Sequence, residues 1–92
     1  MDYRDVIVCV RSGRYIEAAN YAVKDSFGSA INKISPKKRQ KLTIIVADKL
    51  EAKHKTIKSL NQNDFPPDEI AREAYEETVS ELGLDDSRII EL

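Results

Sequence analysis

Residues 35–60 read SPKKRQKLTIIVADKLEAKHKTIKSL, and this stretch decides the expected fold because a helix start signal is followed by helical periodicity. Ser35 can cap a helix, and Pro36 suits its first position, where the missing N–H costs nothing. The apolar residues that follow are spaced as on one face of a helix: Leu42, Ile45, Val46, Leu50, Ile57 and Leu60. The sequence therefore predicts a long helix that ends near Leu60.

A second helical pattern precedes this stretch, and a short apolar element precedes that pattern. From Tyr15 to Ile34, apolar residues recur every three or four positions, which predicts a buried helical face. Gly28 interrupts the pattern at a cost of about 1 kcal/mol relative to alanine, so the helix should bend or break there. The β-branched run in residues 3–11 would suit a strand, but no similar strand is available to pair with it, so we predict a short helix.

The last predicted helix follows a break at residues 61–67. It opens with Asp68 and Glu69, as the helix dipole favours, and Gly83 is expected to close it as a left-handed cap. Residues 85–92 then form an acidic tail. The tail contains three aliphatic residues: Ile89, Ile90 and Leu92. Because these side chains are too apolar to be left solvated, we predict that the tail docks in a groove of this chain or of a partner.

The composition is typical of one soluble helical domain, which we place at residues 1–84. Of the 92 residues, 41% are hydrophobic, which is too many for a wholly disordered chain, while 34% charged residues, three glycines and no tryptophan favour helices over a β-sandwich. The sequence has no apolar run long enough to cross a bilayer and no signal-peptide pattern, so we expect a cytoplasmic protein. The single cysteine, Cys9, is expected to be a small buried hydrophobe.

Charge is distributed unevenly along the chain. Residues 33–58 carry nine lysines and arginines against two acids, whereas residues 64–92 carry ten acids against two arginines. Basic residues crowd the first turns of the helix at Ser35, where each costs about 0.3 to 1 kcal/mol unless an anion lies nearby. That anion could be the acidic last helix, a nucleic-acid phosphate or an acidic protein partner. The candidate partner-binding or anion-binding residues are Lys37, Lys38, Arg39, Lys41, Lys49 and Lys55, and the candidate acidic interaction face is Glu69, Glu73, Glu76, Glu77 and Glu81.

The sequence contains no residue set typical of a catalytic or metal site. His54 is the only histidine, and we expect it to be solvated between two lysines on an exposed face. Glu73, Glu76 and Glu77 lack the Glu-x-x-His pattern of di-metal sites. Because no nucleophile–base pair or metal-ligand set can be assembled, we expect no enzyme activity, no cofactor and no small-molecule substrate.

Several short motifs follow one another between residues 5 and 50: DVI at 5–7, VRSG at 10–13, IEAA at 16–19, Phe27, and IVA at 45–47. In this order the chain resembles the small prohead core proteins of T-even-like tailed phages. Those proteins have a short helix, a Ser-Gly or Ser-Asn turn, an Ala-rich helix and a third helix with a basic and then Ile-Ala pattern. This chain departs from them in its Ser35-Pro36 pair and in a periodic C-terminal helix where they have a long acidic disordered tail. The resemblance implies a non-enzymatic helical scaffold or assembly role.

We therefore predict an all-α bundle of three long helices and a short N-terminal helix, which serves as a self-associating, non-enzymatic interaction or assembly module. The alternative is a nucleic-acid-binding accessory or regulatory protein that uses residues 33–58. The two hypotheses differ in the partner that neutralises the basic helix.

Overall fold

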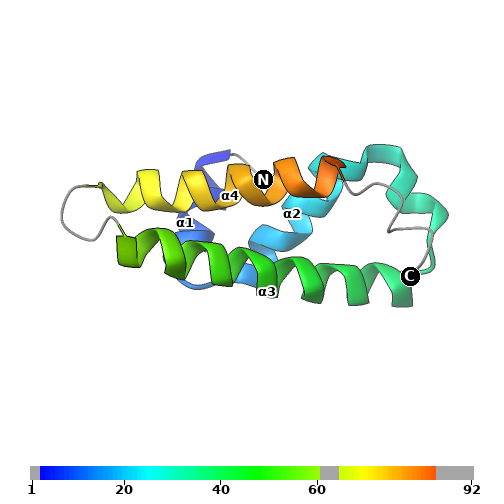
Figure 1. The fold of residues 1–92 in the computed structure, drawn as a ribbon. Helices are drawn as coiled ribbons and strands as arrows, with labels where there is room; N and C mark the ends of the chain where they lie inside the picture. The colour runs from blue at the N-terminus through cyan, green and yellow to red at the C-terminus, as the bar shows by residue number, and fades with distance from the viewer. Residues whose placement is uncertain (1–2, 61–64, 85–92) are drawn as a thin grey trace.

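The computed structural model describes residues 3–60 and 65–84, which form an all-α bundle of four α-helices (Figure 1). The elements in chain order are α1 (Tyr3–Arg11), α2 (Tyr15–Phe27), a 3₁₀ helix η1 (Gly28–Lys33), α3 (Pro36–Leu60) and α4 (Pro67–Leu84). This arrangement confirms the predicted fold class, including the short N-terminal helix. The predicted docking residues of the tail, Ile89, Ile90 and Leu92, lie outside the described residues.

Both C-terminal helices begin with a proline at the first helical position, where no backbone N–H is needed. In α3, the N–H of Lys38 donates to Ser35 Oγ at 3.3 Å, so the predicted Ser35 cap is confirmed. In α4, Asp68 and Glu69 occupy the first turn, where negative charge interacts favourably with the positive end of the helix dipole. Local sequence signals thus set both helix starts.

Glycine ends one helix as predicted but not the other. α2 stops at Phe27, because Gly28 adopts a φ of 51° that other residues rarely tolerate, and the chain continues as η1. The cap predicted at Gly83 is wrong, since α4 continues through Leu84 and includes Gly83 in its last turn.

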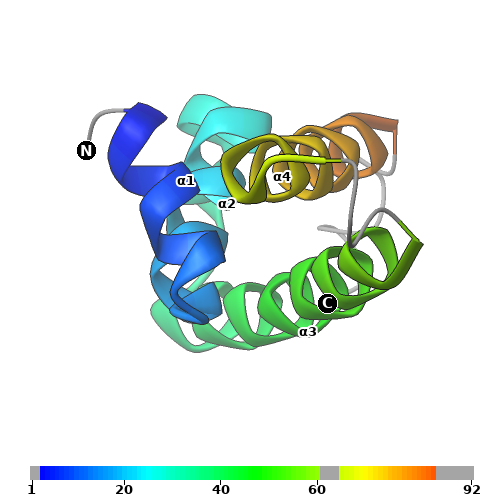
Figure 2. The ribbon, with the colours of Figure 1, turned by 90° about the vertical axis from the view of Figure 1, so that its left-hand side faces the viewer.

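α3 and α4 run antiparallel side by side, and α1 and α2 lie along one side of this pair (Figures 1 and 2). α2 packs against all three other α-helices. It does so through small residues, since Ala18, Ala19 and Ala22 are fully buried and allow close approach of the helix backbones. Cys9 is buried in α1, as predicted.

The buried face of α3 differs from the predicted one. Leu42, Val46, Leu50 and Ile57 are buried as expected, but Ile45 is 50% exposed and Leu60 is 78% exposed. In their place the bundle buries three residues that the apolar pattern left out: Thr43, Ala47 and His54. Residues 43, 47, 50, 54 and 57 recur at helical spacing, so together they form the face toward α2 and α4.

None of the helices that the structure describes is both long enough and apolar enough to span a membrane.

Candidate interaction surface

The register between α3 and α4 leaves one end of α3 uncovered by α4. Lys49 Nζ lies 2.7 Å from Glu81 Oε2, which fixes how the two helices are aligned. Because they are antiparallel, Leu84, the last described residue of α4, lies about level with Val46 of α3. At 1.5 Å per residue, roughly 15 Å at the N-terminal end of α3 therefore extends past α4.

Three cations in the C-terminal half of α3 form ion pairs within the fold: Lys49, Lys53 and Lys55. Lys53 pairs with Glu81 and lies 3.9 Å from Glu77, and Lys55 pairs with Glu51 one turn away at 2.9 Å. Hydrogen bonds from Lys49 and Lys53 hold the pKa of Glu81 below its usual range. Lys49 and Lys55, two of the predicted partner-binding residues, are thus already engaged in ion pairs.

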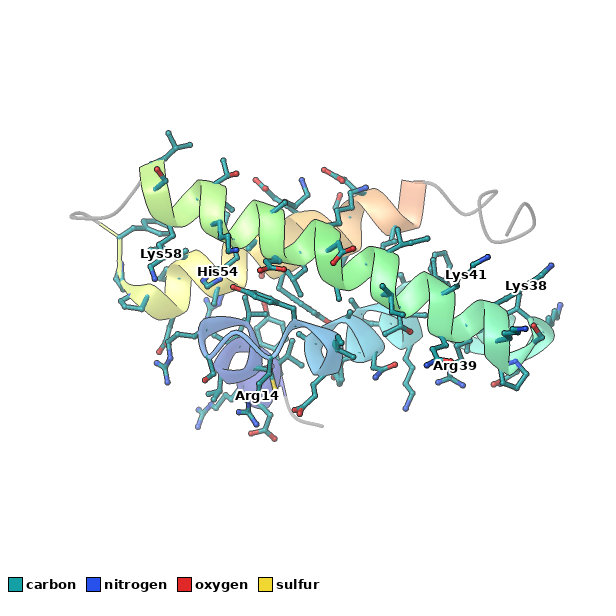
Figure 3. The ribbon with its side chains drawn as sticks, turned by 90° about the horizontal axis from the view of Figure 1, so that it is seen from below. Arg14, Lys38, Arg39, Lys41, His54 and Lys58 are labelled. Carbon is teal, nitrogen blue, oxygen red and sulfur yellow. The ribbon has the colours of Figure 1, made fainter. Side chains whose placement is uncertain are left out.

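Four cations in the first turns of α3 form no ion pair with any residue in 3–60 or 65–84: Lys37, Lys38, Arg39 and Lys41. We call these four residues the basic end. Lys37, Lys38 and Lys41 are exposed, and Figure 3 shows Lys38 and Lys41 pointing away from the bundle. The N-terminus of α3 adds roughly half a positive charge at the same place. The unfavourable concentration of charge that the sequence predicts is therefore not neutralised by any carboxylate in the described part of the chain.

Exposed isoleucines lie beside the basic end. Ile16 is 59% exposed, Ile44 is 48% exposed, and Ile45 follows Ile44 on the outer side of α3. Ile44 lines two adjoining surface hollows, one with Ile16 and Arg39 and the other with the basic-end lysines. Apolar groups surrounded by charged ones are typical of surfaces that bind another protein.

The predicted acidic residues lie along α4, away from the basic end of the same chain. Glu69 pairs with Arg72 at 3.6 Å, and Glu76 Oε1 accepts a hydrogen bond from the Tyr3 hydroxyl at 3.0 Å. Partial burial, with help from Glu76, raises the pKa of Tyr3 to about 12. Glu73 has no ion pair among the residues that the structure describes. Among the residues that the structure describes, Glu77 and Glu81 are the members of this face that form ion pairs with lysines of α3.

The prediction that His54 is solvated is wrong. Its side chain is only 6% exposed, and its Nδ1 lies 2.9 Å from the hydroxyl of Tyr15. The two rings meet edge to face, with centroids 5.8 Å apart. Burial, with help from the charge of Lys58, lowers the pKa of His54. The residue was misplaced because the lysines beside it suggested an exposed face, although its spacing to Leu50 and Ile57 is that of the core.

The residues described by the structure include no group of three or more His, Cys, Asp or Glu side chains that could hold a metal ion. Comparisons with protein-family models, with curated proteins and with solved structures found no match. The resemblance to prohead core proteins stays a prediction, and the inferences below depend on the geometry of this chain alone.

Proposed function

We propose that this protein is a non-enzymatic helical assembly module in which the basic end of one copy binds α4 of a second copy. The observation that supports this proposal is the uncovered basic end beside exposed isoleucines. The matching surface is the acidic outer face, which we define as Glu73, Glu76 and Glu77. These three residues lie at helical spacing on one side of α4, so a second copy would supply the negative charge that the described part of the chain does not place at the basic end.

The isoleucines favour a protein partner over a phosphate backbone. A nucleic acid would neutralise Lys38 and Lys41 but would leave Ile16 and Ile44 in water. A protein surface can cover both kinds of group, and each Å² of apolar surface removed from water contributes about 25 cal/mol. An interface with an apolar centre and a basic rim would therefore cover both the isoleucines and the lysines at this end of α3.

The proposed contact joins two different surfaces of the same chain. Such a head-to-tail contact leaves a free basic end on one copy and a free acidic outer face on the other, so further copies can add. Repetition produces a closed ring or an open filament, depending on the rotation between neighbours. Growth of this kind suits the scaffold role that the resemblance to prohead core proteins implies.

The test uses two complementary variants and measures molar mass by light scattering at low salt. K38Q/K41Q removes charge from the basic end, and E73Q/E76Q removes charge from the acidic outer face. Each variant alone should stay monomeric. Their equimolar mixture should form heterodimers that grow no further, because each partner contributes one intact half of the contact.

A matched control variant, K24Q/K55Q, removes two exposed lysines that lie outside the basic end and should assemble like the wild type. Higher salt should reduce the molar mass of the wild type, since exposed charges more than about 8 to 10 Å apart are then screened. A wild-type protein that remains monomeric at high concentration and low salt would contradict the proposal.

A second candidate function is binding of duplex nucleic acid. It is favoured because Lys37, Lys38 and Lys41 form no ion pair with a residue in 3–60 or 65–84. Binding of this kind depends steeply on salt, with a log–log slope of about −0.9 for each phosphate neutralised. Tight, salt-sensitive binding of duplex DNA by the wild type, lost in K38Q/K41Q and kept in K24Q/K55Q, would support this function in place of self-association.

A further inference from the structure

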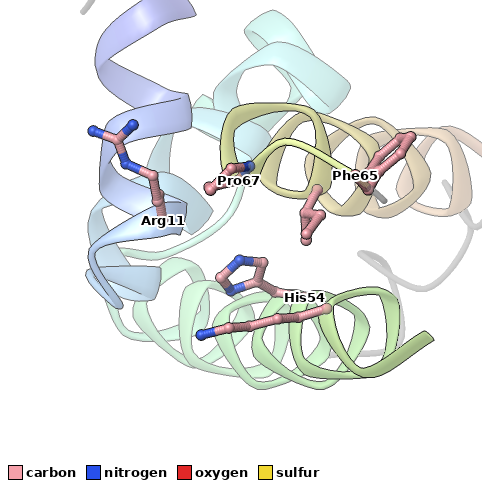
Figure 4. Close-up of a pocket in the computed structure, with 6 residues that line it drawn as sticks. Arg11, His54, Phe65 and Pro67 are labelled. Atoms are coloured by element: carbon pink, nitrogen blue, oxygen red, sulfur yellow. The ribbon is translucent and has the colours of Figure 1, made fainter. Parts of the chain in front are cut away.

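A cavity of about 160 Å³ lies at the other end of α3, where α1, α3 and the start of α4 meet (Figure 4). It is lined by Arg11, His54, Lys58, Phe65, Pro67 and Ile70. The first three side chains form a basic wall, and the last three form an apolar wall. These residues come from distant parts of the sequence, so no local sequence motif predicts the site.

His54 gives the basic wall a fixed hydrogen-bonding group. Its Nδ1 is engaged by the Tyr15 hydroxyl, and Figure 4 shows its ring directed from α3 toward the start of α4. The side chain is 94% buried, given its 6% exposure, so it is held in place by packing. The ring nitrogen that Tyr15 does not use, Nε2, is therefore the polar atom available toward the cavity.

Among the residues that the structure describes, those around the cavity carry a net positive charge. Arg11 of α1 pairs with Asp68 of α4 at 2.5 Å, whereas Lys58 of α3 has no ion pair among the residues in 3–60 and 65–84. Tyr15 of α2 is neutral near pH 7, and its pKa is raised by burial. The cations Arg11 and Lys58 thus lie near a single described carboxylate, that of Asp68. The positive charge of Lys58 also disfavours protonation of His54.

We propose that this cavity binds a small organic carboxylate with an apolar body about the size of a benzene ring. The carboxylate would lie between Lys58 and His54, and the body would lie against Phe65, Pro67 and Ile70. The volume fits this assignment, since a protein cavity of about 150 Å³ is known to accommodate benzene. An inorganic anion would leave the apolar wall uncovered, and a neutral hydrocarbon would leave Lys58 without a counter-charge.

The only histidine in the chain makes a direct test possible, because its ring Hε1 gives a single NMR signal. Benzoate, benzyl alcohol and inorganic phosphate are titrated separately into the wild-type protein. Benzoate should shift the Hε1 signal with saturation and a Kd on the order of 1 mM, a reasonable affinity for a ligand of this size. It should also raise the pKa of His54, because a bound anion favours the imidazolium. The other two probes should bind at least about tenfold more weakly.

K58Q and K55Q are matched variants, since both replace an exposed lysine of α3 and only Lys58 lines the cavity. K58Q should weaken benzoate binding about tenfold, the loss expected for one charge-assisted contact, while K55Q should bind like the wild type. An absence of saturable shifts with benzoate, or equal affinities for K58Q and K55Q, would overturn the proposal. Equal binding of inorganic phosphate and benzoate would also overturn it, by showing a simple anion site. None of these outcomes depends on self-association.

Discussion

Replacing His54 with glutamine should remove a pH dependence from the stability of the fold. Burial holds the pKa of His54 down in the folded chain, whereas in the unfolded chain a histidine titrates near 6.5. Above that pH, both states carry a neutral ring and stability does not change. As the pH falls below about 6.5, only the unfolded state takes up the proton, so the wild type loses stability until the pH reaches the lower, folded-state pKa.

The size of the effect follows from one proton bound by the unfolded state alone. In the affected window the free energy of unfolding should fall by up to about 1.4 kcal/mol per pH unit. His54 is the only histidine in the chain, and histidine is the side chain whose ordinary pKa lies in this window. A loss of stability that begins as the pH falls through about 6.5 can therefore be assigned to His54.

Urea denaturation at a series of pH values measures this slope in the wild type and in H54Q. Glutamine keeps a polar group that can hydrogen-bond to Tyr15, and an unchanged m-value would show that the variant exposes the same surface on unfolding. The wild type should lose stability below about pH 6.5 while H54Q stays level in the same window. Equal slopes in the two proteins would refute the reasoning, because His54 would then take up its proton as readily in the folded chain.

Three other substitutions or truncations have defined outcomes. L50A removes a fully buried side chain and should lower the free energy of unfolding by about 2 to 5 kcal/mol in urea denaturation. S35A removes the cap of α3 and should lower the free energy of unfolding by about 0.5 to 2 kcal/mol. The loss should lie toward the lower value, because the hydrogen bond from Lys38 N–H to Ser35 Oγ is 3.3 Å long. An unchanged Tm would show that the cap does not stabilise the fold. Deletion of residues 87–92 should cost a few kcal/mol, since each aliphatic side chain that docks contributes roughly 1.5 to 3 kcal/mol, and an unchanged Tm would show that the tail does not dock.

The sequence predicted the helix starts and the break at Gly28 because these features depend on neighbouring residues. Ser35 and Pro36 act within one turn, and the φ of Gly28 needs no distant contact. The buried face of α3 was predicted less well, because the pattern counted only large apolar residues and so left out Thr43, Ala47 and His54. His54 lies four residues after Leu50 and three before Ile57, and this spacing is the signal that could have placed it in the core.

The location of the candidate sites was harder to predict, because it depends on how the helices align. The sequence shows a basic block and an acidic helix, but only the contact of Lys49 with Glu81 shows where α4 ends along α3. A shift of α4 by two turns would move its last residue about 11 Å along α3, enough to cover much of the basic end. The cavity likewise needs Arg11 and Ile70 brought together from opposite ends of the chain.

The two proposed sites lie at opposite ends of one long helix, and this separation makes them electrically independent. Lys38 and Lys58 are twenty positions apart, which is roughly 30 Å along α3. At physiological ionic strength, charges interact through solvent over only about 8 Å, so a carboxylate bound beside Lys58 does not change the field at the basic end. The core between them, which includes Val46 and Leu50, is buried and lies next to both sites. A substitution that weakens binding at both sites should therefore do so by lowering the stability of this core. A substitution that alters the charge at one end of α3 should affect binding at that end alone.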